Sequence, residues 1–276
     1  MTDAAPGRPA GPDAPGPADA PGPADAADAE GAGAFASATG RTLEEGSGAA
    51  QPNYKAYQLE LMRPHVGRSL LEVGAGLGEL AETFARGMDL ERHVVTDVDP
   101  GAVAQIARRF ADRPEVEARR LDLDGELPDL GAPVATVLAS NVLEHIEDDA
   151  GALRRLARLV EPGGTVVMFV PAYMQLYGDF DRRVGHVRRY TPATLRSAFE
   201  RAGLAPRLVR PVNLLGGVAW WAAVRRGGVG TPRPGLVRVY DGVVVPVTRL
   251  LEKVVTPPFG QSVLGVAEVL PGASDR

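Results

Sequence analysis

Three glycines at alternate positions are the first residues in the chain that predict contact with a ligand. The glycines are Gly74, Gly76 and Gly78. They follow a run that ends at Val73 and is apolar apart from one acid, Glu72. This pattern predicts a buried strand, a tight turn and the start of a helix, whose free backbone N–H groups can meet a ligand lying directly on the backbone. Many nucleotide-binding folds have such a turn, so its meaning depends on the residues that follow it.

Acidic residues follow the next two predicted strands. Asp97 comes roughly 20 residues after the glycine turn, where a carboxylate can accept hydrogen bonds from both hydroxyls of a ribose. Asp99 is a rival for this role, but an aspartate before Pro100 is also a good helix N-cap, so we favour Asp97 for the ribose. Asp122, beside Leu123, can accept a hydrogen bond from an adenine amine; the alternative is an ordinary acidic loop residue.

Five short motifs lie in order between the first predicted strand and the fifth. They are Glu72–Gly78, Asp97–Asp99, Leu121–Leu123, Asn141–Ile146 and Glu161–Gly164. In order and in spacing, the set resembles the class I S-adenosylmethionine-dependent methyltransferases, and within them the bacterial methyltransferases of types 11 and 12. Any one motif can arise by chance, but five in register indicate a relationship.

The resemblance implies S-adenosylmethionine as the cofactor and a role for each matching residue. Asp97 binds the ribose, Asp122 and the Leu123 backbone border the adenine, and Asn141 lies near the reacting sulfonium. The glycines border the methionine part, and Glu72 anchors their turn. The residues that the resemblance assigns to the cofactor are Glu72, Gly74, Gly76, Gly78, Asp97, Asp122, Leu123 and Asn141.

Two other function classes compete with a methyltransferase. A nicotinamide oxidoreductase is disfavoured, because dinucleotide sites prefer Gly-x-Gly-x-x-Gly, whereas Glu79 stands here at the helix start and opposes a pyrophosphate. A non-catalytic subunit that binds S-adenosylmethionine is the other alternative, and the intact turn and acids weigh against it.

The catalytic candidates follow the fifth predicted strand, in a predicted substrate loop over residues 171–191. An unperturbed imidazole titrates near neutrality, so a histidine such as His186 can take a proton from a hydroxyl or an amine, with Tyr190 or Asp181 orienting it. The alternative is that the acids and arginines of this loop form ion pairs that hold it in place. We expect His186 and Tyr190 to serve transfer to an oxygen or nitrogen of a small molecule, such as a sugar, a lipid-linked compound or a secondary metabolite. His145, by contrast, is expected to pack near the cofactor rather than act as a base.

Strand and helix patterns alternate from Arg68 onward and must position these residues. They predict an α/β fold with a Rossmann-like, mostly parallel seven-stranded sheet, helices on both faces and an antiparallel last strand. The predicted strands are Ser69–Val73, His93–Thr96, Val116–Leu121, Val134–Ala139, Thr165–Val170, Arg207–Arg210 and Gln261–Val269. The predicted helices are Glu79–Arg86, Pro100–Ala111, Asp149–Val160, Pro192 to about Gly203, Val212–Arg226 and Val237–Val254, the last kinked at Pro246.

Composition divides the chain and excludes several classes of partner. Residues 1–50 are rich in Ala, Pro, Gly and Asp and are expected to form a disordered tail, because they have little to bury. Residues 51–276 are expected to form the methyltransferase domain, with a helical insert over 212–258. The net charge of −5 argues against nucleic acid as a partner, and the absence of cysteine excludes disulfides and thiolate metal sites. We expect no metal site and a cytoplasmic location.

The insert contains an apolar stretch, 212–226, with Trp220 and Trp221 in it. One interpretation is a helix packed on the core or in a homodimer. A second is peripheral contact with a membrane surface, and a third is a wall of the acceptor pocket.

Overall fold

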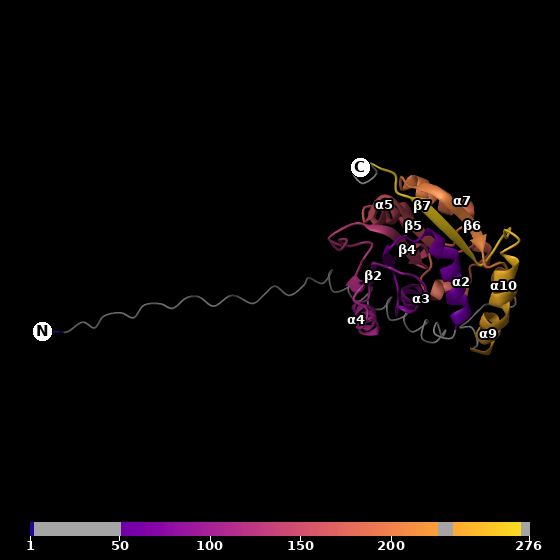
Figure 1. Cartoon of the computed structure of the whole chain (residues 1–276), viewed down its shortest axis with the longest axis horizontal. Helices are drawn as coiled ribbons and strands as arrows, with labels where there is room; N and C mark the ends of the chain where they lie inside the picture. The colour runs from indigo at the N-terminus through magenta and orange to yellow at the C-terminus, as the bar shows by residue number, and fades with distance from the viewer. Residues whose placement is uncertain (3–50, 226–233, 272–276) are drawn as a thin grey trace.

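The structure is a computed structural model that describes residues 1–2, 51–225 and 234–271 (Figure 1). The tail predicted for residues 1–50 lies outside the described residues apart from its first two, so it stays a prediction. Within the described ranges, no helix is long and apolar enough to span a membrane.

A seven-stranded sheet lies at the centre of the domain, with strand order β3-β2-β1-β4-β5-β7-β6. Strands β1 to β5 pair in parallel, and β7 runs antiparallel to both β5 and β6. The strands are β1 (Ser69–Val73), β2 (Arg92–Asp97), β3 (Val116–Arg120), β4 (Val134–Ser140), β5 (Val160–Pro171), β6 (Ala205–Val212) and β7 (Ser262–Glu268). The predicted fold class is confirmed, including the antiparallel last strand.

Helices cover both faces of the sheet, which explains the nearly continuous apolar runs of the central strands. The helices are α2 (Pro52–Met62), α3 (Glu79–Gly87), α4 (Pro100–Arg109), α5 (Asp149–Ala157) and α7 (Pro192–Arg201). Leu71 packs in one apolar cluster with side chains of α5 and α7, whereas its neighbour Leu70 packs in another with side chains of α2 and α3. Adjacent residues of β1 thus pack against the helices on opposite faces of the sheet.

Local signals in the sequence decide where several helices begin. Asp99 caps α4 by accepting a hydrogen bond from the Gly101 N–H at 2.8 Å, and Thr191 caps α7 by accepting from the Thr194 N–H at 3.1 Å. Both are residues whose short polar side chains satisfy a free helix N–H group. The N-cap role expected for Asp99 is confirmed.

The largest departures from the predicted elements lie around β5. This strand begins at Val160 rather than Thr165, because the segment with Gly163 and Gly164 continues the strand beyond a register shift against β4. The predicted loop after β5 contains a 3-10 turn, η4 (Met174–Leu176), and a short helix, α6 (Asp179–Arg183). Another 3-10 turn, η3 (Leu143–His145), follows β4.

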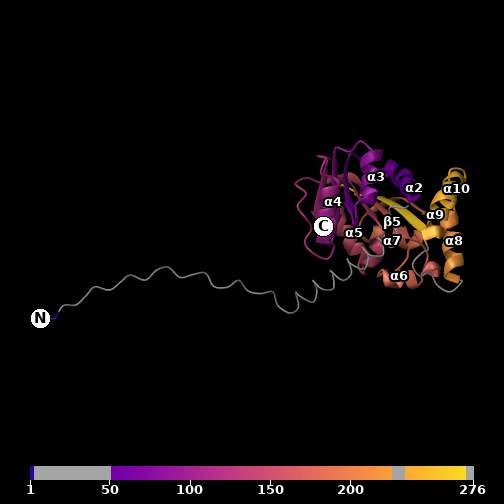
Figure 2. The same cartoon turned by 90° about the horizontal axis from the view of Figure 1, so that it is seen from below.

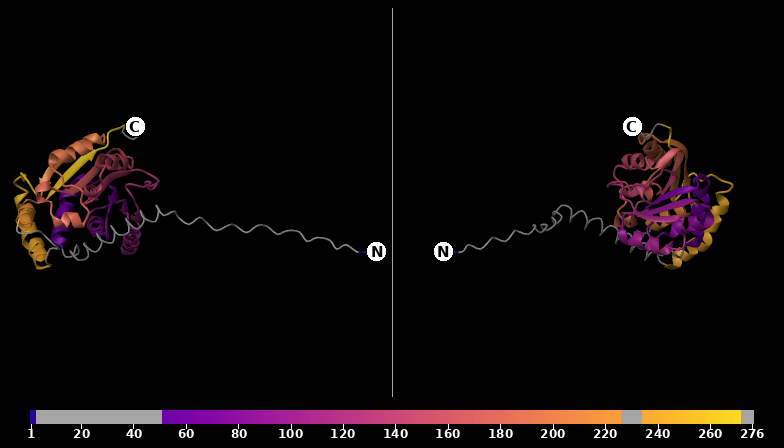
Figure 3. Two further views of the ribbon diagram at one scale, coloured as in Figure 1. Left: turned by 180° about the vertical axis from the view of Figure 1, so that it is seen from behind. Right: turned by 60° about the vertical axis from the view of Figure 1, so that its left-hand side comes forward.

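The helical insert forms a group at one side of the domain (Figures 2 and 3). It consists of α8 (Leu214–Arg225), α9 (Pro234–Val239), a π-helical turn η5 (Tyr240–Val244) and α10 (Val245–Leu251). The last predicted helix is therefore divided. The π turn ends at Val244, two residues before Pro246, which stands in the first turn of α10. Proline has no N–H to donate to the preceding turn, so the hydrogen-bond pattern changes there.

Asp241, in the π turn, joins the insert to α2. Its side chain is buried and accepts hydrogen bonds from the Tyr54 N–H at 2.9 Å and from the N–H and Nδ2 of Asn53 at 3.3 and 3.1 Å. Gln51, at the N-cap position of α2, makes no side-chain cap. Asp241 therefore supplies from a distant segment the cap that α2 lacks, and its charge suits the helix N-terminus.

Replacing Asp241 by alanine tests this link. Asp241→Ala should lower the free energy of unfolding by about 1–3 kcal/mol, because it leaves partly buried N–H groups of α2 without an acceptor. Urea titration followed by circular dichroism measures the change. Asp89→Ala is the control, since the Asp89 side chain is almost fully exposed and pairs only at the surface with Arg68. Equal stability of the two variants would contradict the assignment.

Candidate functional site

The glycine turn between β1 and α3 is built on left-handed backbone. Gly74, Gly76 and Gly78 have φ angles of 68°, 57° and 76°, values that side chains with a Cβ rarely adopt. A Cβ on Gly74 would also collide with the Val142 side chain, in the loop after β4. Conformation and close packing therefore both require glycine at position 74.

Asp97 is hydrogen-bonded to this turn. Its Oδ2 accepts from the Gly76 N–H at 2.8 Å, and its Oδ1 accepts from the Asp99 N–H at 3.0 Å. Burial raises the pKa of the Asp97 carboxyl, while these backbone hydrogen bonds oppose the rise. Each carboxylate oxygen retains acceptor capacity beyond its one backbone partner.

Parallel strands bring the other predicted cofactor residues to the same edge of the sheet, beyond the ends of β3 and β4. Asp122 is held by the Asp124 N–H at 3.1 Å and Arg120 Nη2 at 3.2 Å, beside the buried Leu123. Asn141 has a left-handed φ of 56°, its backbone N–H donates to the Phe169 carbonyl at 2.8 Å, and its side chain is exposed. Asparagine tolerates this conformation better than most residues.

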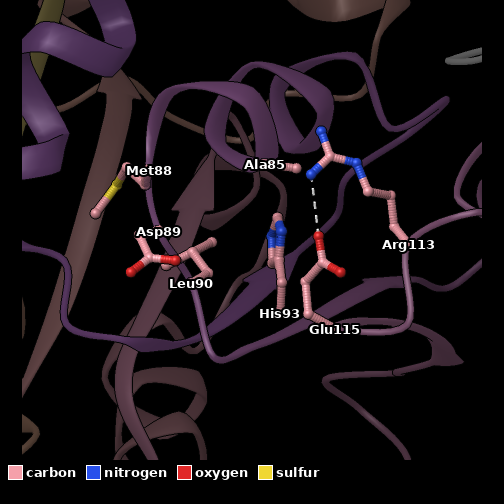
Figure 4. A pocket seen from close by; sticks show the side chains of 7 residues that line it. All are labelled: Ala85, Met88, Asp89, Leu90, His93, Arg113 and Glu115. Carbon is pink, nitrogen blue, oxygen red and sulfur yellow. Dashed lines mark hydrogen bonds and ion pairs between the residues drawn. The ribbon is translucent and has the colours of Figure 1, made fainter.

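Glu72 faces a different part of the domain. Its Oε2 lies 3.4 Å from Nε2 of His93, and both side chains are buried. His93 lines a cavity of about 310 Å³ (Figure 4). It stands near the start of β2, whereas Asp97 ends that strand. The anchoring of the turn by the Glu72 side chain stays a prediction.

His186 belongs to a buried cluster of ionisable side chains. Its Nδ1 lies 2.7 Å from Asp181 Oδ1, and its Nε2 lies 3.6 Å from Glu144 Oε1. Its ring meets the His145 ring edge-on, with the centroids 4.7 Å apart. The Val187 N–H donates to the Glu144 carbonyl at 2.9 Å, so the backbone also joins the substrate loop to η3.

Burial determines the ionisation of this cluster. It raises the pKa of the fully buried Glu144 to about 8. Burial, and then the neighbouring His186, lowers the pKa of His145 to about 4. Burial acts to raise the pKa of Asp181, but hydrogen bonds from His186 and Arg189 outweigh it and hold that pKa below its ordinary value. At neutral pH, Asp181 is therefore charged and His145 is neutral.

Arg189 holds Asp181 from the other side. Its Nε and Nη2 donate to the two carboxylate oxygens at 2.7 and 3.0 Å, a two-pronged contact of high geometric specificity. Its Nη1 donates to the Ala172 carbonyl at 3.2 Å, and its guanidinium lies 5.5 Å from the centre of the Trp220 ring. For this arginine, the expected ion pair that holds the loop is confirmed.

Tyr190 lies in the core, not beside the predicted substrate. It is 1% exposed, and its hydroxyl lies 3.3 Å from the Leu143 carbonyl and 3.2 Å from Asp149 Oδ2. Burial raises its pKa above the ordinary value. The part of Tyr190 in catalysis stays a prediction, and the residue that contacts His186 is the alternative candidate, Asp181.

An apolar hollow of about 380 Å³ lies between the substrate loop and the insert. Its lining residues are Tyr173, Gln175, Leu176, Val218, Trp221 and Phe259. Trp220 Nε1 donates to the Leu176 carbonyl at 2.9 Å, and the Trp220 ring meets Phe180 edge-on at 5.5 Å. The hollow therefore adjoins the side chains that pack against His186 and Arg189.

Sequence reasoning missed the contact of Glu144 with His186. Glu144 stands inside the motif Asn141–Ile146, and no local pattern shows that its side chain turns inward toward the later loop. The one signal in the sequence is a carboxylate directly after the apolar pair Val142 and Leu143.

Comparison with known proteins agrees with this geometry. A family model described as a methyltransferase domain matches residues 71–166. The ubiquinone biosynthesis O-methyltransferase of Paracidovorax citrulli is 34% identical over 109 residues, which cover 38% of this chain and 44% of that protein. The chain thus matches less than half the length of this curated relative.

Solved structures share the fold. The methyltransferase in complex with the Haloferax volcanii Trm112 methyltransferase activator superposes with a TM-score of 0.60 at 20% identity, over 86% of this chain and 98% of that one. The geranyl diphosphate C-methyltransferase of Streptomyces coelicolor superposes with a TM-score of 0.54 at 16% identity, over 78% and 77%.

The close approach at Gly74 can be tested against a matched glycine. Gly74→Ala should destabilise the protein by about 1–3 kcal/mol more than Gly131→Ala, because an added methyl meets Val142 at the first position and open space at the second. Both glycines have left-handed φ angles, 68° and 72°, so the backbone strain is matched. Urea denaturation measures both variants, and equal losses of stability would show that the turn is not tightly packed there.

Proposed function

We propose that this protein transfers a methyl group from S-adenosylmethionine to an oxygen or nitrogen atom of a small molecule, as a class I S-adenosylmethionine-dependent methyltransferase. The match of a methyltransferase-domain family model to residues 71–166 supports this proposal. The observation that carries the proposal is the hydrogen bond of Asp97 to the glycine turn, beside the ends of four parallel strands. A nicotinamide oxidoreductase is no longer retained, because the matched domain belongs to methyltransferases.

The residues at the strand ends fit this cofactor. The turn from Gly74 to Gly78 presents backbone without side chains, and Asp97 has acceptor capacity left for the ribose hydroxyls. Asp122 and Leu123 follow β3, where they would contact the adenine. Asn141 follows β4, where it would lie near the sulfonium end of the cofactor. Glu79 begins α3, and a carboxylate at this helix start suits a cationic ligand better than a pyrophosphate.

Bound S-adenosylmethionine would supply a strongly electrophilic methyl group, so the protein's main task is to hold the acceptor in line with it. His186 is the residue of the substrate loop best placed to assist. Asp181 accepts a hydrogen bond from the Nδ1–H group of His186, which leaves Nε2 as the basic nitrogen of the ring. Arg189 keeps Asp181 in place for this contact.

The apolar hollow favours an acceptor with an apolar portion, such as a lipid-linked compound. Trp221 lines it and is 46% exposed, so part of the wall is open to solvent. We also propose that the stretch 212–226 makes peripheral contact with a membrane, because a membrane surface and a lipid-linked acceptor both offer hydrocarbon to an apolar helix. The name of the Paracidovorax relative, an O-methyltransferase, supports oxygen as the accepting atom.

The ribose role of Asp97 is tested by cofactor affinity. Asp97→Ala should weaken binding of S-adenosylmethionine more than tenfold, about 1.4 kcal/mol, in calorimetric titration. Asp99→Ala is the control: it removes the cap of α4 and should keep the affinity close to that of the unaltered chain. An unchanged affinity of Asp97→Ala would remove this residue from the cofactor site, and no binding by the unaltered chain would contradict the proposed function.

The role of His186 is tested by turnover. His186→Ala should lower methyl transfer from radiolabelled S-adenosylmethionine to fractions of a cell extract at least tenfold, with cofactor affinity intact. His65→Ala, which changes a histidine outside the cluster, should transfer normally. Binding without transfer by the unaltered chain would favour the alternative of a non-catalytic subunit.

A further inference from the structure

The cluster around Glu144 has the composition of a metal site. Glu144 and His145 lie in η3, and His186 reaches them from the segment after α6; one ligand atom from each lies within 4.8 Å of the others. The Glu144 side chain is fully buried, and neither of its carboxylate oxygens has a hydrogen-bond partner. An ionised carboxylate buried without a partner is costly, so Glu144 can keep its charge only when a cation lies beside it; otherwise it takes up a proton.

The Nδ1 atom of each histidine ring faces an acceptor oxygen. His186 Nδ1 faces Asp181 Oδ1 at 2.7 Å, and His145 Nδ1 faces the Gly185 carbonyl at 3.3 Å. A carboxylate and a carbonyl can only accept, so each neutral ring carries its proton on Nδ1 and its basic lone pair on Nε2. Metal-binding histidines usually donate their other ring N–H to such acceptors, which fix the tautomer and the direction of the ring.

Asp181 acts as a positioning residue for this site. Arg189 binds both of its oxygens, and the Gly178 N–H also donates to it at 2.9 Å. These donors compensate its charge, so Asp181 orients His186 and leaves Glu144 as the carboxylate for the ion.

We propose that Glu144, His145 and His186 bind one divalent first-row transition ion, of the kind of Zn²⁺, Fe²⁺ or Mn²⁺. Two imidazoles and one carboxylate suit such ions, whereas Mg²⁺ prefers oxygen ligands alone. This departs from the expectation, made from the sequence, of no metal site. Three protein ligands leave positions open for water or another oxygen ligand.

The ion gives His186 a different part in turnover. With the ion bound, Nε2 is a ligand and no longer a base, and the open positions can hold an oxygen of the acceptor. This role in turnover rests on the proposed function, whereas the binding of the ion does not depend on it.

The test uses the full chain without an affinity tag, stripped with a chelator and then titrated with Zn²⁺ in a calorimeter. We expect one ion per chain, and at least tenfold weaker binding by Glu144→Gln and by His186→Ala. His65→Ala should bind as the unaltered chain does. Absence of one-to-one binding, or equal affinity across these variants, would overturn the site.

Proton NMR of the unaltered chain keeps the test independent of how the variants fold. The chain has four histidines, and Zn²⁺ should shift the imidazole signals of His145 and His186 while leaving those of His65 and His93 in place. Shifts confined to His65 or His93 would contradict the proposal. Calorimetry with S-adenosylmethionine on the same stripped sample separates the outcomes: Zn²⁺ binding without cofactor binding removes the proposed function and leaves the metal site.

Discussion

The close packing of the Val142 side chain against Gly74 is the constraint on which the candidate site depends. The turn after β1 can meet the loop after β4 only because position 74 has no side chain to collide with Val142. The hydrogen bond from the Gly76 N–H to Asp97 then ties the same turn to the end of β2. Three strand ends are held together in this way, and the shape of the predicted cofactor site follows from it.

A second centre organises the side of the domain where the acceptor is proposed to bind. Asp181 receives hydrogen bonds from His186 and Arg189, and Arg189 also lies over Trp220 of the insert. The charged contact is buried, so its strength depends on exact partner geometry rather than on charge alone. Through it, the segment after β4, the substrate loop and α8 contact one another, although they are far apart in the chain.

The insert is joined to the cofactor side as well. Asp241 binds the start of α2. Helix α2 in turn contacts the start of α3 through the ion pair of Lys55 with Glu79, and the end of β4 through Gln58, whose Nε2 lies 3.3 Å from the Ser140 Oγ. The insert therefore reaches the predicted cofactor site through α2 and the predicted acceptor site through α8. A movement of the insert would therefore change contacts near both sites.

The sequence by itself determined the elements and their order, together with the turn. These depend on rules that act over a few residues: apolar runs for buried strands, glycine where φ is positive, and a short polar side chain before a helix, as at Asp99. Because parallel strands end at one edge, the placement of Asp97, Asp122 and Asn141 at that edge followed from the same rules.

Only the tertiary structure decided which polar side chains are buried and what they meet. Tyr190 looked like a partner of His186 from its spacing, yet its hydroxyl turns into the core toward Asp149. The cap of α2 comes from a residue 188 positions away, and Glu144 meets a histidine of a later loop. Burial and desolvation are set by neighbours from distant segments, so no local pattern contains them.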